Sequence, residues 1–78
     1  MTRPLYEIAK DIRKHWQSVY FGAAPYLEAM GSMAGIGDKY GVDDGRYIVT
    51  YFLGNAQGFR GPDAKRIKAE LKLLLKGA

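Results

Sequence analysis

Residues 46–57, RYIVTYFLGNAQ, are the densest apolar stretch of this 78-residue chain, and their secondary structure decides the fold. No charged residue occurs from Tyr47 through Phe59. Tyr, Ile, Val, Thr and Phe favour strands, but a strand that is apolar on both sides needs partners that the rest of the chain does not offer. As a helix, the stretch gathers its apolar residues on one broad face. We therefore expect a buried helix with this face: Ile48, Val49, Phe52, Leu53 and Ala56.

Three further helices are indicated by apolar residues at helical spacing between Gly and Pro connectors. Pro4 is expected at the first helical position, after a cap at Thr2 or Arg3. No segment outside the central stretch reads as a strand. The whole chain, residues 1–78, is thus predicted to be a single all-α domain. It is expected to be a compact array of four short helices at about residues 4–20, 24–33, 44–57 and 62–76.

The segment before the central helix has the composition of a loop. Residues 35–45 hold four glycines and three aspartates, a composition typical of turns. We expect a loop with at most a short helical turn around residues 38–40. Asp43 or Asp44 is expected to cap the central helix, because a carboxylate there accepts hydrogen bonds from the free N–H groups of the first turn.

Composition and charge narrow the class of protein. The chain has no cysteine, 47% hydrophobic residues and a net charge of +4, which suit a small globular domain. It shows neither a signal-peptide pattern nor an apolar run of membrane-span length, so we expect a cytoplasmic protein without membrane contact. The charge is uneven: residues 1–20 carry +2, residues 21–45 carry −3 and residues 46–78 carry +5.

Several sequence blocks occur in order along nearly the whole chain: MTRPLYEIA, VYFGAAPYLEAM, a YG…DD loop, YFLGNAQGFRG and AKRIKAELKLLL. In these blocks the chain resembles a group of short proteins of unknown function from actinobacterial phages and related bacterial genomes. The resemblance implies a small protein carried by a phage or another mobile element and present in the host cytoplasm. It implies no activity, cofactor or catalytic residue.

No catalytic constellation is recognisable in the sequence. His15 is the only histidine, and neither Ser18 nor Ser32 lies in a nucleophile-elbow context. His15 falls on the charged side of its predicted helix, so we expect a solvated side chain. The aspartates of residues 35–45 lack the alternating oxygen ligands of a calcium loop. We therefore predict a protein that is not an enzyme and that has no metal ion, no cofactor and no small-molecule substrate.

Aromatic residues give the main indication of function. Ten of them are too many for one small core to hide together with every Leu, Ile and Met. Tyr and Trp bring a large contact area to an interface at low entropic cost. Core packing is the alternative for each residue. We predict a module that binds a host protein, with anti-defence activity as one hypothesis, or a second copy of itself, through Trp16, Tyr20, Tyr26, Tyr47, Tyr51 and Phe59.

The C-terminal helix supports a second hypothesis, which is nucleic-acid binding. Lysines recur on one side of its apolar face, and such a stripe suits contacts with phosphates. Base-reading Arg, Asn and Gln are scarce there, which argues against sequence-specific recognition. A solvated border, whose aliphatic stems cover the core, is the structural alternative. The candidate phosphate-binding residues are Arg60, Lys65, Arg66, Lys68, Lys72 and Lys76.

Overall fold

The computed structural model describes residues 3–41 and 43–77, and the all-α class predicted from the sequence is confirmed. Within those residues the helices are α1 (Leu5–His15), α2 (Ala24–Met30), α3 (Gly45–Gly54) and α4 (Pro62–Gly77). Two strands of two residues each, β1 (Lys39–Tyr40) and β2 (Asp43–Asp44), pair antiparallel just before α3.

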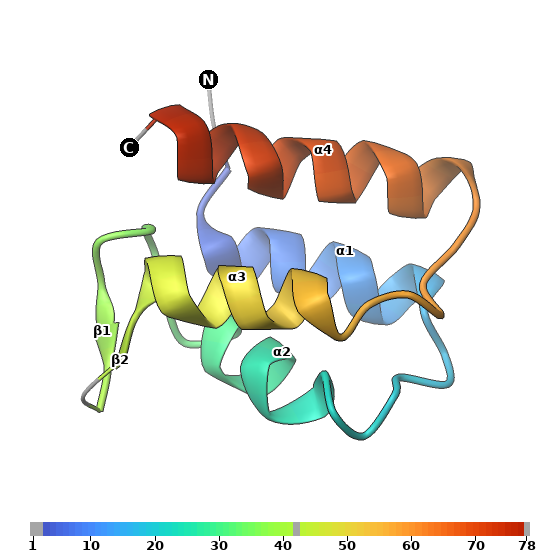
Figure 1. Cartoon of the computed structure of the whole chain (residues 1–78), viewed down its shortest axis with the longest axis horizontal. Helices are drawn as coiled ribbons and strands as arrows, with labels where there is room; N and C mark the ends of the chain where they lie inside the picture. The colour runs from blue at the N-terminus through green and yellow to red at the C-terminus, as the bar shows by residue number, and fades with distance from the viewer. Residues whose placement is uncertain (1–2, 42, 78) are drawn as a thin grey trace.

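The helices pack around one core (Figure 1). α1 and α3 run through the middle of the molecule, with α4 on one side of them and α2 on the other. Each of the two middle helices contacts both outer helices. The β1–β2 ladder projects from the end at which α3 begins. This order places α2 and α4 on opposite sides, so each contributes to a different surface.

The stretch RYIVTYFLGNAQ supplies the central helix α3, as its apolar pattern predicts. Ile48, Val49 and Phe52 are buried. The predicted cap is confirmed, because the Asp44 carboxylate accepts a hydrogen bond from the N–H of Tyr47 at 3.1 Å. The apolar residues that surround α3 in the core come from every other helix and from their connectors: Leu5, Ile8, Ile12, Trp16, Leu27, Met30, Met33, Phe59, Ile67 and Leu71.

α3 is shorter than predicted and ends at Gly54 instead of residue 57. Two amide side chains explain the early end. Asn55 donates from Nδ2 to the carbonyl of Tyr51 at 2.9 Å, and Gln57 donates from Nε2 to the carbonyl of Gly54 at 2.6 Å. These donors replace the backbone N–H groups that a longer helix would use.

The start of α1 also differs from the prediction. Pro4 is the cap residue and not the first helical residue, and it offers no side-chain acceptor. The first free N–H groups of the helix, those of Leu5 and Tyr6, instead donate to the carbonyls of Ala34 and Met33, each at 2.9 Å. The alternative cap Thr2 lies outside the described residues.

Both α1 and α2 end earlier than predicted. α1 stops at His15 instead of residue 20, because the chain turns at Trp16 and directs the Trp16 ring into the core. α2 stops at Met30 instead of residue 33. The residues after it leave the helix, which frees the carbonyls of Met33 and Ala34 to receive the N–H groups of α1.

The loop before α3 holds the β1–β2 ladder and not the helical turn predicted around residues 38–40. Asp38 organises it. The Asp38 carboxylate accepts from the N–H groups of Ala34 and Gly35, at 2.8 and 3.3 Å. The Asp38 carbonyl accepts from the N–H of Gly45 at 2.7 Å. Gly41, at φ +67°, supplies the left-handed residue of the tight turn.

Candidate protein-binding surface

Three tyrosines stack in a row across α2 and α3. Tyr47 and Tyr51 are one helical turn apart on α3, and their rings lie 6.2 Å apart at an angle of 13°. Tyr26 on α2 stacks against Tyr51 at 5.6 Å and 25°. Tyr47 is 58% exposed and Tyr51 50% exposed, whereas Tyr26 is half-buried. The row is thus a stacked aromatic surface in which Tyr47 and Tyr51 are exposed and Tyr26 packs against the core.

Two more aromatic side chains extend this surface at the end of α3. Phe21 is 81% exposed, and its ring lies 4.8 Å from that of Tyr20. A Cβ atom on Gly22 would lie 2.6 Å from the Tyr20 ring and 2.9 Å from the Asn55 amide oxygen, so both side chains pack onto this glycine. Asn55 in turn donates to the carbonyl of Tyr51. We name the five side chains the aromatic face: Tyr20, Phe21, Tyr26, Tyr47 and Tyr51.

Two predicted contact residues belong to the core instead. Trp16 is 7% exposed and Phe59 is 1% exposed. Their rings stack on each other at 5.1 Å and 15°, and the edge of Trp16 meets Phe52 at 6.1 Å. The assignment of Trp16 and Phe59 to a contact surface is therefore corrected. Phe21 was not among the predicted contact residues, although its place between Tyr20 and Gly22 is a signal of an exposed corner.

A hollow of about 420 Å³ lies beside the aromatic face at the start of α3. Tyr47 and Tyr51 line it together with Asp44, Arg46 and Thr50. The Arg46 guanidinium donates to the carbonyl of Leu75 at 3.0 Å, which holds this side chain at the rim. Aromatic and charged groups thus meet in one concave place, an arrangement that suits a protruding side chain of a partner.

The predicted phosphate-binding residues fall into three groups: those that line a second hollow, the exposed Lys72 and Lys76 farther along α4, and Arg66. Arg60, Lys65 and Lys68 line this second hollow, between the end of α3 and the start of α4. The Lys68 amine lies 5.8 Å from the centre of the Phe59 ring. Burial lowers the pKa of Lys68, and the nearby charges of Lys72 and Arg60 lower it further. Lys76 is exposed at the far end of α4.

Arg66 does not belong with these lysines. It donates to the Asp11 carboxylate at 3.1 Å and to the Asp63 carboxylate at 3.2 Å, on the side of α4 that faces α1. These hydrogen bonds, first that to Asp11, raise the pKa of Arg66. Arg66 is therefore already paired with two carboxylates and is not among the cations that line the hollow.

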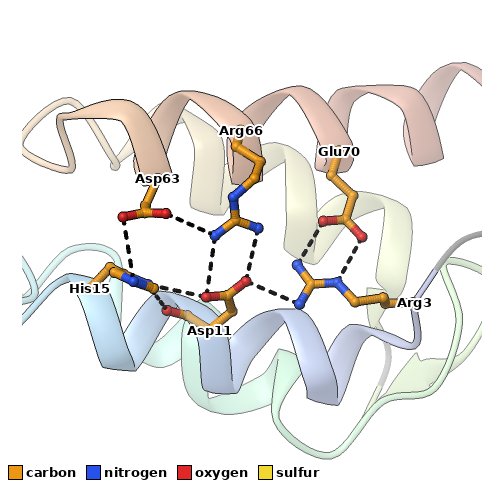
Figure 2. Close-up of polar contacts among 6 residues, drawn as sticks. All are labelled: Arg3, Asp11, His15, Asp63, Arg66 and Glu70. Atoms are coloured by element: carbon orange, nitrogen blue, oxygen red, sulfur yellow. Dashed lines mark hydrogen bonds and ion pairs between the residues drawn. The ribbon is translucent and has the colours of Figure 1, made fainter.

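A polar network joins α4 to α1 (Figure 2). Arg3 forms a two-bond ion pair with Glu70, at 3.0 and 2.7 Å, and also contacts Asp11 at 3.0 Å. Figure 2 shows that the side chains of the two helices meet in the space between them. The network was not predicted, because its strongest pair joins residues 67 positions apart. Its members are Arg3, Asp11, His15, Asp63, Arg66 and Glu70.

His15 is exposed, as predicted, but it is also part of this network. Its side chain is 30% exposed. Nδ1 lies 3.1 Å from Asp11 Oδ1, and Nε2 lies 3.4 Å from Asp63 Oδ2. The imidazole therefore lies between two carboxylates that Arg66 also contacts (Figure 2). This geometry explains a helix-to-helix contact, with no serine or other nucleophile among its members.

The network predicts a loss of stability in acid. The hydrogen bond from Arg66 lowers the pKa of Asp11, and that from Arg3 lowers the pKa of Glu70. Carboxylates with lowered pKa values stabilise the fold above their ordinary pKa values, 3.8 and 4.5, and lose this contribution as the pH falls through their values in the folded protein. We expect the free energy of unfolding, measured with urea by circular dichroism, to fall as the pH drops below about 4.5.

Glu70→Gln tests whether the network carboxylates cause this loss of stability in acid. At neutral pH the variant is expected to lose about 1 kcal/mol, because the two-bond pair with Arg3 is partly exposed. Its stability should also fall less steeply in acid than that of the unchanged chain. Glu28→Gln removes an exposed carboxylate of α2 outside the network and is the matched control. Equal acid dependence of the Glu70→Gln variant and the unchanged chain would contradict the assignment.

Comparison with known proteins identified no relative of this chain. No protein-family model, curated protein or solved structure matches the chain. Across residues 3–41 and 43–77, no group of three or more His, Cys, Asp or Glu side chains is placed to hold a metal ion. In the same part of the chain, no helix has the length and apolar content needed to cross a membrane.

Proposed function

We propose that this chain is a non-enzymatic protein-binding module that covers a surface of its partner with the aromatic face. The observation that supports this proposal is the row of stacked tyrosines on α2 and α3, in which the two on α3 are exposed, together with the exposed Tyr20 and Phe21. Large exposed apolar groups cost solubility unless a partner covers them, and clustered ones mark interaction sites. Tyrosine is also among the residues that contribute most to binding energy at interfaces.

The aromatic face is held in place before any partner arrives. Tyr51 is stacked on both sides, by Tyr26 and by Tyr47, and two of these rings come from one helix. Side chains that are already ordered lose little entropy on binding. The adjoining hollow, with Asp44 and Arg46 at its edge, adds charged groups that can select among partners. Together these features support a specific contact.

The partner that we propose is a protein of the bacterial host, and the effect is modulation of that protein, with inhibition of a host defence as one hypothesis. This part of the proposal comes from the resemblance to phage-borne proteins. A second copy of the chain is the alternative partner. The chemistry of the contact, a rigid tyrosine row against an apolar patch, is the same in both cases.

Capture of partners from an actinobacterial lysate tests the proposal. We expect the unchanged chain to recover a specific protein and Tyr47→Ala/Tyr51→Ala to bind it at least about tenfold more weakly, since central tyrosines carry much of the energy of an interface. Tyr6→Ala, which removes an exposed tyrosine of α1 outside the aromatic face, is the matched control and should bind as the unchanged chain does. Circular dichroism checks that both variants are folded.

Two results would contradict the proposal. One is a recovered partner that binds Tyr47→Ala/Tyr51→Ala as tightly as the unchanged chain. The other is recovery of no specific protein together with a monomeric mass at every concentration in light scattering. A mass that rises with concentration, and that Tyr47→Ala/Tyr51→Ala returns to the monomer value, would instead assign the aromatic face to a second copy of the chain.

A further inference from the structure

The connector between α3 and α4 forms a hollow of about 640 Å³ that the protein-binding proposal does not use. It lies where α4 begins, and α4 and α2 occupy opposite sides of the molecule (Figure 1). Pro62 and Ala64 line its apolar part, and the Phe59 ring lies beneath. Gly61 adds no side chain, and the space where its Cβ atom would lie is open, with no atom within 4 Å. The hollow therefore has an apolar wall.

Three cationic side chains surround this hollow without a carboxylate partner among the described residues: Arg60, Lys65 and Lys68. The two acidic residues of α4 are engaged on another side of the helix, Asp63 with His15 of α1 and Glu70 with Arg3 just before α1. The same helix thus separates a neutralised side from a side with uncompensated positive charge. Such a concentration of like charge destabilises the free protein unless an anion is near.

The surroundings of Lys68 also favour an anion near the hollow. Its amine lies over the Phe59 ring and is partly removed from water. Burial and the charges of Lys72 and Arg60 lower the pKa of Lys68, which means that these surroundings destabilise its charged form. An anion between these cations would relieve the repulsion. The Nε atom of Arg60 donates to the carbonyl of Gln57 at 3.2 Å, which positions the guanidinium at the rim. The two terminal nitrogens of Arg60 have no protein acceptor among the described residues.

The apolar part of the hollow limits which anion fits. Inorganic phosphate would leave Pro62 and the aliphatic stems of the lysines uncovered. A ligand that joins a phosphate to a flat apolar ring fills both parts, since the phosphate pairs with the cations and the ring rests on the apolar wall. Nucleotides have this construction. The lining offers no amide side chain of the kind that reads base edges, so base-specific recognition is not expected.

We infer that the hollow at the α3–α4 connector binds a nucleotide phosphate, held by Arg60, Lys65 and Lys68, with the base against Pro62 and the lysine stems. The nucleotide is either a free mononucleotide or one unit of a nucleic-acid strand, and both present the same chemistry. A strand would continue along α4 toward Lys72 and Lys76, which lie on the same helical stripe. This site is separate from the aromatic face and is independent of the proposed protein partner.

Nuclear magnetic resonance titration of the isotope-labelled chain at low salt tests the inference. Adenosine monophosphate is expected to shift the amide signals of residues 59–68, inorganic phosphate to shift them at higher concentration, and adenosine to leave them in place. Lys65→Gln/Lys68→Gln should weaken adenosine monophosphate binding about tenfold or more, because two charge-assisted contacts are lost. Arg60→Gln, at an exposed position, should weaken it in the same direction and covers the case in which the double variant does not fold.

Control variants and a second probe separate the outcomes. Lys10→Gln removes an exposed lysine of α1 and should leave binding unchanged, as should Tyr47→Ala/Tyr51→Ala. A short single-stranded oligonucleotide that binds more tightly than adenosine monophosphate, and is displaced by it, would identify the strand as the source of the nucleotide. The inference is overturned if adenosine shifts the same signals as adenosine monophosphate. It is also overturned if the Lys65→Gln/Lys68→Gln and Arg60→Gln variants bind both probes like the unchanged chain.

Discussion

Phe59→Ala is expected to lower the free energy of unfolding by about 3–5 kcal/mol, the range for loss of a buried aromatic ring. The Phe59 ring is 1% exposed, stacks on Trp16 at 5.1 Å and lies under the Lys68 amine. Its removal leaves a cavity where α1, the connector and α4 meet, and both the stacking and the cation–π contact are lost. A domain of this size has a total stability of roughly 4–12 kcal/mol, so the variant is expected to be close to unfolding.

Phe21→Ala is the matched control for that prediction. The same atoms are removed, but Phe21 is 81% exposed, so the free energy of unfolding should change by less than about 0.5 kcal/mol. Urea denaturation followed by circular dichroism measures both variants. Similar stabilities for Phe59→Ala and Phe21→Ala would show that the Phe59 ring is not in the core, and would return it to the candidate contact residues.

The helices themselves can be predicted from local sequence, but their ends cannot. The helical face of α3 and the cap at Asp44 depend on residues within one or two turns of each other, so their pattern is visible in the sequence. The four helices follow from the same local reasoning. Their ends do not, because α1 stops where the Trp16 ring enters the core and α2 stops where its following carbonyls bind α1. Those causes are tertiary.

The candidate surface, like the helices, could be predicted only in part from the sequence. Tyr47 and Tyr51 flank the apolar face of α3 in the sequence, and the structure exposes both. Trp16 and Phe59 have the same residue chemistry, but their burial depends on where α1 ends. The sequence also could not distinguish Arg66, which is paired with carboxylates, from the lysines of α4. The acceptor of Arg66 is Asp11, 55 positions away, and no local pattern signals a contact over that distance.

Gly45→Ala is expected to destabilise the chain by about 3 kcal/mol, at the upper end of the usual cost of overpacking a core. A Cβ atom at this position would lie 2.7 Å from the carbonyl oxygen of Ile36 and 2.9 Å from that of Gly35. Both obstacles are backbone atoms, which cannot turn aside as a flexible side chain can. The N–H of Gly45 also donates to the carbonyl of Asp38 at 2.7 Å, which holds the two segments together. The loop must move away from α3 to admit the methyl group.

Gly54→Ala separates this steric cost from helix propensity. Gly54 is the last residue of the same helix, and a Cβ atom there would meet nothing within 4 Å. Alanine is favoured over glycine in helices, so this variant should gain about 0.5–1 kcal/mol while Gly45→Ala loses stability. Thermal and urea unfolding of both variants would show opposite signs for the same chemical change. If both variants became more stable, the close approach of residues 35–36 to the start of α3 would be ruled out, and with it the packing that places Asp44 and the aromatic face.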